Sequence, residues 1–289
     1  MENQIKYKNK ISLNQAKKKI IAHAFSVNYP IFDKNYNSIK LKNVEDVSNY
    51  LKQNNYDLES LAEKCRDYTE RVPLFENLLS TTWQVISSFK NADDATNKNG
   101  SISLVNESTG KTELEIKSNG EFAFSPYQSK FEKAVKYLNM AVNNASFEDF
   151  LTAITSGISS IETYLNYRAG LYNNLHSNEK LIDNQLIKVR FEDKIDWWIP
   201  KMTNKKIDKS ADSWRHFKEL KNKRDKLDQH NHNIPIGGTY VDLCQLINKF
   251  RSGIAQFIND LHVIFNEKTP TCVINAIYMP DVEIINNNK

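Results

Sequence analysis

Glycine and proline are scarce in this chain of 289 residues, which contains 8 and 7 of them respectively. Because these residues interrupt helices, their scarcity favours a helix-rich protein and argues against an all-β architecture. Apolar side chains are plentiful, since 40% of the residues are hydrophobic. A chain of this length and composition can bury a real core, so disorder of the whole chain is excluded.

Cysteine is rarer still, with 3 residues. Cys65, Cys244 and Cys272 are widely spaced and odd in number, so they indicate neither a disulfide framework nor a CxxC zinc site. Long hydrophobic runs are missing too: no segment approaches the ~18 apolar residues that span a bilayer, and the first residues lack the apolar core of a signal peptide. We therefore expect a cytoplasmic protein in a reducing compartment, with no membrane partner.

A strong excess of charge is also absent. Lysine and arginine total 39 against 35 acidic residues, which leaves a formal net charge of +4. This surplus is too small to indicate nucleic-acid binding by itself, so any such argument depends on local clusters.

Apolar spacing and turn residues divide the chain into four parts. Residues 1–95 form an N-terminal helical region, with three- and four-residue apolar spacings from about 43 to 89 and a break near Pro73. Residues 96–126 alternate apolar and polar side chains, which predicts a small β-meander with strands at 101–105, 112–117 and 121–124. Residues 127–267 form a helical bundle. In the tail, 268–289, we expect one more strand over 272–279 that pairs with the meander.

The bundle is predicted from four long helical patterns, at about 128–143, 146–175, 210–229 and 240–265. Ser146 is a good N-cap for the second helix, because Asp149 follows three residues later. An irregular insertion, about 177–209, separates the second and third helices. The fold class is therefore mainly α, with a C-terminal four-helix bundle, an N-terminal helical region and a small β-meander.

The third helix carries an arginine on its apolar face. By helical spacing Arg224 falls among apolar residues such as Phe217 and Leu220. Burying a guanidinium is costly unless it finds an acidic partner, a phosphate or a wet cleft. His230 follows six residues later, about 120° away on an unbroken helix. Stop signals in 231–238 loosen the helix end, so the two side chains can converge on one phosphate.

An arginine and a histidine at one phosphate can cleave RNA without a metal. His230 would exchange the proton of the 2′-hydroxyl near neutral pH, and Arg224 would donate to the phosphate oxygens that gain charge. Asp225 would orient either partner. DNA lacks the 2′-hydroxyl and would not react by this route. Four lysines on the same helix would steer the RNA backbone, unless they simply form a solvated face: Lys218, Lys221, Lys223 and Lys226.

Two other groups of polar residues could suggest a metal site, but we interpret neither of them as one. The pair His230 and His232 has no further metal ligands at a recognisable spacing, so we expect no metal site and no cofactor. The acidic residues Glu192, Asp193 and Asp196 are interpreted as a solvated face rather than a two-metal centre.

The motif resembles that of HEPN domains, in which Arg and a polar residue precede His by four to six positions, late in the third helix of a small bundle. Arg224, Asp225 and His230 match it, and residues 156–166 resemble the second HEPN helix, with Glu162 as its acidic residue. The resemblance covers about half of the chain. It implies a homodimer with a composite site and endoribonuclease activity that leaves a 2′,3′-cyclic phosphate. It also implies a bacterial toxin or anti-phage defence setting, with an antitoxin or defence-system partner.

Three hypotheses follow. The first is a metal-independent endoribonuclease that uses Arg224 and His230, with Asp225 and Glu162 orienting them. The second is a non-catalytic HEPN-like module that binds RNA, a nucleotide or another protein. In the third the domain is a helical scaffold, and Arg224 pairs with Glu162 inside the core.

Overall fold

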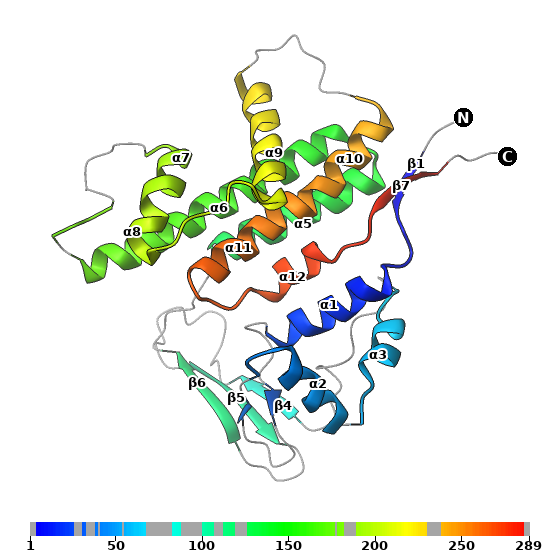
Figure 1. The fold of residues 1–289 in the computed structure, drawn as a ribbon, viewed down its shortest axis with the longest axis vertical. Coiled ribbons are helices and arrows are strands. Elements are labelled where there is room, and N and C mark those ends of the chain that lie inside the picture. Colours follow the sequence, from blue (N-terminus) through cyan, green and yellow to red (C-terminus); the bar gives the residue numbers. More distant parts are fainter. Residues whose placement is uncertain are drawn as a thin grey trace.

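The computed structural model describes the greater part of the chain. The described residues are 4–25, 31–32, 38–39, 41–53, 55–67, 83–87, 100–106, 112–118, 126–176, 178–181, 189–229 and 238–285. The chain is mainly helical, as predicted, and the largest hydrophobic core lies among the C-terminal helices (Figure 1). Within the described residues, no helix is both long enough and apolar enough to cross a bilayer.

The four predicted helical patterns of the C-terminal half are confirmed. The helices are α5 (Pro126–Asn143), α6 (Phe147–Leu175), α9 (Asp212–Gln229), α10 (Tyr240–Phe250) and α11 (Gln256–Ile264). A π-helical segment, η2 (Arg251–Ala255), joins α10 to α11, so the fourth pattern is one continuous helix. Ser146 caps α6 by accepting a hydrogen bond from the Asp149 amide at 3.1 Å, which confirms the predicted N-cap.

Two glycines let these helices approach closely. A Cβ atom at Gly157 of α6 would lie 2.8 Å from Ile254, and one at Gly253 of η2 would lie 2.9 Å from the backbone nitrogen of Phe217 in α9. The absence of a side chain at both positions therefore allows η2 to pack against α6 on one side and α9 on the other. The close contact at Gly253 sets the position at which α9 crosses η2 (Figure 1).

The insertion between α6 and α9 is more regular than predicted. It contains α7 (Phe191–Asp193), the π-helical η1 (Lys194–Trp198) and α8 (Ile199–Thr203). Phe191, Ile195 and Trp198 are buried at helical spacing, and Pro200 lies in the first turn of α8, where its missing N–H is tolerated. The prediction of an irregular segment was wrong for this part, because short helical segments follow one another without a break from Phe191 to Thr203.

The N-terminal part has a small core of its own. Its elements are β1 (Gln4–Tyr7), α1 (Leu13–Ala24), β2 (Ile31–Phe32), β3 (Ser38–Ile39), α2 (Val44–Gln53) and α3 (Leu58–Lys64). A capping box between Ser12 and Gln15 starts α1, and Asp57 caps α3. The three helices share a core that contains Ile20, Leu51 and Leu61 and is separate from the core of the bundle. Figure 1 shows them on the side of α12 away from α5 and α6.

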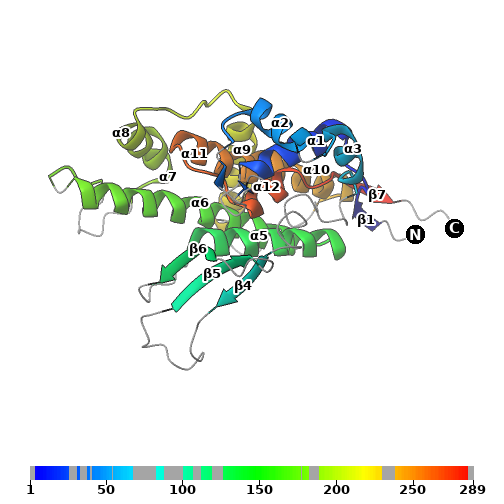
Figure 2. The same cartoon turned by 90° about the horizontal axis from the view of Figure 1, so that it is seen from below.

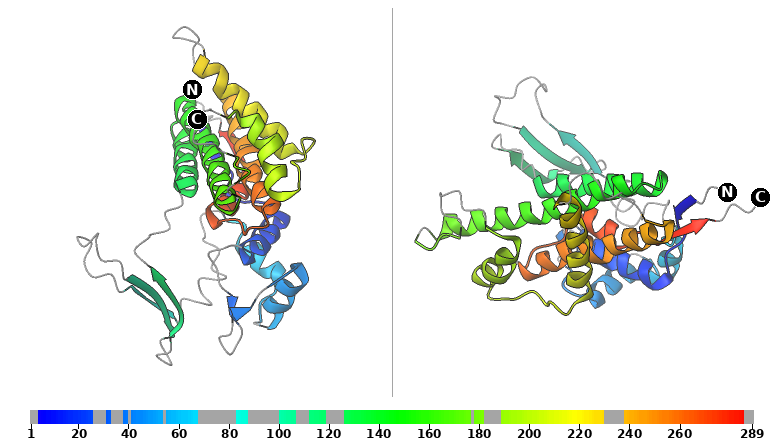
Figure 3. Two further views of the ribbon diagram at one scale, coloured as in Figure 1. Left: turned by 90° about the vertical axis from the view of Figure 1, so that its left-hand side faces the viewer. Right: turned by 90° about the horizontal axis from the view of Figure 1, so that it is seen from above.

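The predicted meander is partly confirmed. A three-stranded antiparallel sheet has the order β4 (Trp83–Ser87), β5 (Gly100–Asn106) and β6 (Thr112–Ser118). Two strands match the prediction, whereas β4 belongs to a segment predicted to be helical. The β-branched pair Val85 and Ile86 fits a strand, and its spacing from earlier leucines imitated a helix. The predicted strand at 121–124 lies outside the described residues. The sheet projects away from the helices (Figures 2 and 3).

The prediction of a strand over 272–279 was wrong. This segment is mostly helical, α12 (Thr271–Ile277), which starts after Pro270 and buries Val273, Ile274 and Ala276. Apolar, β-branched composition alone does not separate a strand from a short buried helix. The tail does contain a strand, β7 (Val282–Ile285), but it pairs antiparallel with β1, so the first and last described strands lie side by side (Figure 1).

Candidate functional site

The first part of α9 is fixed by apolar and polar contacts. Trp214, Phe217 and Leu220 are buried, as their helical spacing predicts. On the same helix the Ser213 hydroxyl donates to Asp260 at 2.5 Å, and a ring nitrogen of His216 lies 2.7 Å from the Ser252 hydroxyl oxygen. The helix is therefore anchored before it reaches the predicted site.

Arg224 lies half-buried near the end of α9, with 18% of its side chain exposed. Its Nε and Nη2 atoms donate to the same oxygen, Oδ1 of Asp225, at 2.8 and 2.5 Å. Charge-assisted hydrogen bonds of this kind restrict the direction of the guanidinium. Asp225 therefore restricts the orientation of the Arg224 side chain.

Asp225 also accepts from a second cation. Its Oδ2 atom is 2.7 Å from Nζ of Lys221, four residues earlier on the helix. Burial raises the pKa of the Asp225 carboxyl, but the hydrogen bonds from Lys221 and Arg224 outweigh it and leave the pKa below its ordinary value. The carboxylate is therefore charged at neutral pH between two cations.

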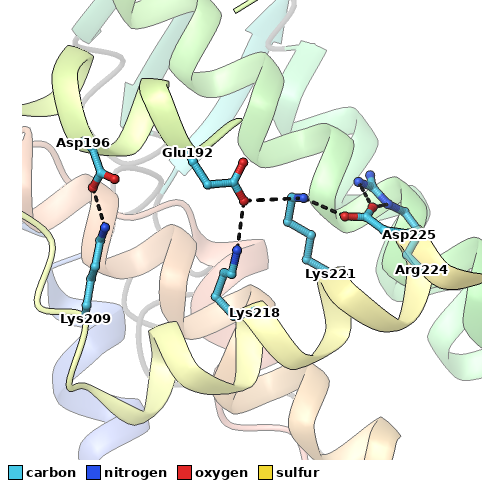
Figure 4. A network of polar contacts seen from close by, with 7 residues as sticks. All are labelled: Glu192, Asp196, Lys209, Lys218, Lys221, Arg224 and Asp225. Carbon is cyan, nitrogen blue, oxygen red and sulfur yellow. Dashed lines mark hydrogen bonds and ion pairs between the residues drawn. The ribbon is translucent and has the colours of Figure 1, made fainter. Parts of the chain in front are cut away.

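The ion pairs continue to the insertion. Oε1 of Glu192 on α7 is 2.9 Å from Nζ of Lys218 and 3.7 Å from Nζ of Lys221. The hydrogen bond from Lys218 is the main reason that the pKa of Glu192 lies below its ordinary value, although burial opposes it. Figure 4 shows the resulting chain of alternating charges along α9, which ends at Arg224. We call these five residues the α9 ion-pair chain: Lys218, Glu192, Lys221, Asp225 and Arg224.

The other predicted site residues have separate environments. Lys223 places its ammonium 6.0 Å from the centre of the Phe147 ring, and Lys226 is exposed. Glu162 is half-buried on α6 and lies near Lys194 of η1, whose pKa is lowered by burial against the opposing charge of Glu162. His230 lies outside the described residues. Of the predicted residues, the structure thus brings together Arg224 with Asp225 and two of the four lysines.

Lys194 is a buried cation that the sequence analysis did not single out. Its Nζ donates to Oδ1 of Asn166 at 2.8 Å and lies 5.3 Å from the centre of the Trp198 ring. Burial lowers the pKa of this lysine, and the nearby Glu162 opposes the effect. Glu162 therefore helps a lysine of the insertion to remain charged.

Comparison with protein-family models, with curated proteins and with solved structures finds no match for this chain.

A second polar cluster lies where α5, α6 and the end of α11 meet. The Tyr164 hydroxyl donates to Glu267 at 2.5 Å, and Arg168 contacts the same carboxylate. Buried His262 has one ring nitrogen 3.4 Å from Glu267 and the other 3.3 Å from the Tyr127 hydroxyl. The pKa of Tyr164 is raised, first by burial and then by Glu267. The cluster joins three helices around one carboxylate.

Sequence reasoning missed the contribution of the insertion to the site. Glu192 was interpreted as part of a solvated acidic face, and its side chain is 45% exposed, but its pairing with Lys218 and Lys221 was not predicted. The signal that could have placed it is the helical spacing of Phe191, Ile195 and Trp198, which predicts a helix packed by one face. In the part of the chain that the structure describes, no group of three or more His, Cys, Asp or Glu side chains is arranged to hold a metal ion.

Proposed function

We propose that this protein is a metal-independent endoribonuclease of the HEPN type, with Arg224 and His230 at its site. The observation that carries the proposal is the environment of Arg224. Its guanidinium is oriented by Asp225, its side chain is 18% exposed, and it lies close to the end of a helix whose first half is anchored in the bundle. A fixed cation that solvent can reach is what stabilisation of a phosphate requires.

The chemistry divides between the two residues. Arg224 would hold the scissile phosphate and donate to the oxygens that gain charge. His230 would exchange a proton with the 2′-hydroxyl or with the leaving oxygen. Asp225 would keep the guanidinium in place, and the product would carry a 2′,3′-cyclic phosphate.

The biological setting belongs to the same proposal. The motif favours a homodimer with a composite site that acts on RNA in the bacterial cytoplasm. A toxin or phage-defence system, with an antitoxin or defence-system partner to restrain it, is the setting that the motif implies.

The decisive experiment is incubation of the purified protein with total RNA in EDTA. We expect cleavage by the wild type, none by His230→Ala or Arg224→Ala, and 2′,3′-cyclic phosphate ends on the products. Matched controls are His176→Ala, which changes an exposed histidine, and Arg215→Ala, which changes an exposed arginine of the same helix that pairs with Asp212 at 2.6 Å. Cleavage by folded His230→Ala at the wild-type rate would refute the proposal.

A second candidate is a binding module without cleavage. The ion pair of Arg224 favours this candidate over cleavage, because two of its N–H groups already donate to Asp225 rather than to oxygens that gain charge in a transition state. It predicts that RNA binds to the wild type and remains intact after long incubation in EDTA and in magnesium.

A further inference from the structure

Two lysines of α9 converge on one carboxylate oxygen. Nζ of Lys218 and Nζ of Lys221 lie 2.9 and 3.7 Å from Oε1 of Glu192 (Figure 4). The lysines are three positions apart, so they share one face of the helix. A phosphodiester oxygen has the charge and the acceptor capacity to replace a carboxylate oxygen between two ammonium groups.

Glu192 combines a fixed backbone with an accessible side chain. Its neighbour Phe191 is buried, and the Lys221 ammonium lies 5.8 Å from the centre of the Phe191 ring, so α7 is held against α9. The Glu192 side chain is 45% exposed and that of Lys218 is 31% exposed. An ion pair as accessible as this contributes at most about 1 kcal/mol. A competing anion can therefore displace the carboxylate while α7 stays in place.

Lys221 differs from Lys218 in depth and in partners. Only 12% of its side chain is exposed, and it also donates to Asp225, which holds Arg224. If Glu192 is displaced, Lys221 keeps this second carboxylate, whereas Lys218 loses its hydrogen bond to Glu192. An anion that replaces Glu192 would thus accept the hydrogen bond that Lys218 now donates to Glu192. It would share Lys221 with Asp225, the carboxylate that contacts Arg224.

We propose that Lys218 and Lys221 form a binding site for RNA phosphates and that Glu192 covers it as an internal competitor. The inference rests on the proposed function for its ligand, RNA, but it does not require cleavage. Glu192 lowers the affinity for polyanions, so that short or weakly bound RNA does not occupy the face of α9.

The test is the affinity for a fluorescently labelled 2′-O-methyl RNA single strand, which lacks the reactive hydroxyl, measured over a series of salt concentrations. The variant is Glu192→Gln. Its matched control is Asp196→Asn, which removes the same charge from an exposed ion pair of the insertion, Asp196 with Lys209 at 2.6 Å. Long-range electrostatics change similarly in both variants.

We expect Glu192→Gln to bind RNA about fivefold more tightly, which is the fold-change for about 1 kcal/mol. The plot of log affinity against log salt should also steepen by about 0.7 for each cation newly engaged with a single strand. Asp196→Asn should change both quantities less. In a Lys218→Gln/Lys221→Gln background, Glu192→Gln should have no larger effect than Asp196→Asn.

Equal effects of Glu192→Gln and Asp196→Asn would overturn the inference. An undiminished gain in affinity in the double-lysine background would do the same. So would the absence of RNA binding by both the wild type and Glu192→Gln at the lowest salt. Should Glu192→Gln fail to fold, Lys218→Gln and Lys209→Gln can be compared instead. Lys218→Gln should weaken RNA binding more than Lys209→Gln does, and equal affinities would overturn the inference. Absence of cleavage in EDTA, with the Glu192→Gln gain intact, would refute the nuclease and leave the phosphate site standing.

Discussion

His23 connects the N-terminal helices to the bundle, and its burial makes the stability of the protein depend on pH. The residue is 4% exposed, and its Nε2 atom lies 3.0 Å from Oδ1 of Asn275, which joins α1 to α12. Burial and, next, the positive charge of Lys19 lower the pKa of His23 to about 4, against the hydrogen bond to Asn275. At neutral pH the imidazole is therefore uncharged.

The sign of the effect follows from the two protonation equilibria. The unfolded chain binds a proton at His23 near pH 6.5, whereas the folded protein does so only near pH 4. Protonation in this window favours unfolding, so the stability is complete above pH 6.5 and decreases as the pH falls towards 4. Between pH 8 and pH 5 the loss amounts to about 2 kcal/mol.

Urea unfolding followed by far-UV circular dichroism at pH 8, 6 and 5 measures this loss. The variant His23→Gln keeps an N–H donor for Asn275 but does not titrate. We expect the wild type to lose about 2 kcal/mol more than this variant between pH 8 and 5. The exposed-site variant His176→Gln should behave like the wild type. Parallel pH profiles for the wild type and His23→Gln would refute the reasoning.

Two further predictions concern packing and the second polar cluster, and both are measured by urea unfolding. Gly253→Ala should destabilise the protein by about 1–3 kcal/mol, because the new Cβ would meet the backbone of α9. The control Gly170→Ala meets no atom within 4 Å and should stabilise α6 by about 0.5–1 kcal/mol; equal effects would contradict the crossing. Tyr164→Phe removes the donor to Glu267 and should cost about 1.5–3 kcal/mol. Exposed Tyr167→Phe should cost under about 0.5 kcal/mol, and a similar value for Tyr164→Phe would show that the buried hydrogen bond contributes nothing.

The helices of the bundle were predictable because their signals are local. The cap formed by Ser146 and Asp149, and apolar residues at three- and four-residue spacing, place α6 within a residue of its predicted start. The same logic located α9 and the buried face that contains Phe217. These features depend on residues within one or two turns, which a sequence displays directly.

The errors occurred where contacts distant in sequence decide the structure. The strand β7 forms because Val282 and its neighbours pair with β1, more than 270 residues away, while α12 takes the segment that looked like the strand. The contact of Glu192 with Lys218 likewise depends on how the insertion folds back. Local sequence patterns predict neither the pairing of β7 with β1 nor the contact of Glu192 with Lys218, because the topology of the whole chain sets pairings across such distances.

The two carboxylates of the α9 ion-pair chain differ in how strongly they are held. Asp225 accepts three hydrogen bonds from Arg224 and Lys221, whereas Glu192 accepts one from Lys218 and has a longer contact with Lys221. Each charge-assisted hydrogen bond contributes more than a neutral one. Asp225 accepts more of them, so removing Asp225 costs more than removing Glu192. An incoming polyanion therefore displaces Glu192 first. Arg224 keeps its orientation during this exchange, because the carboxylate that fixes it is not the one that leaves.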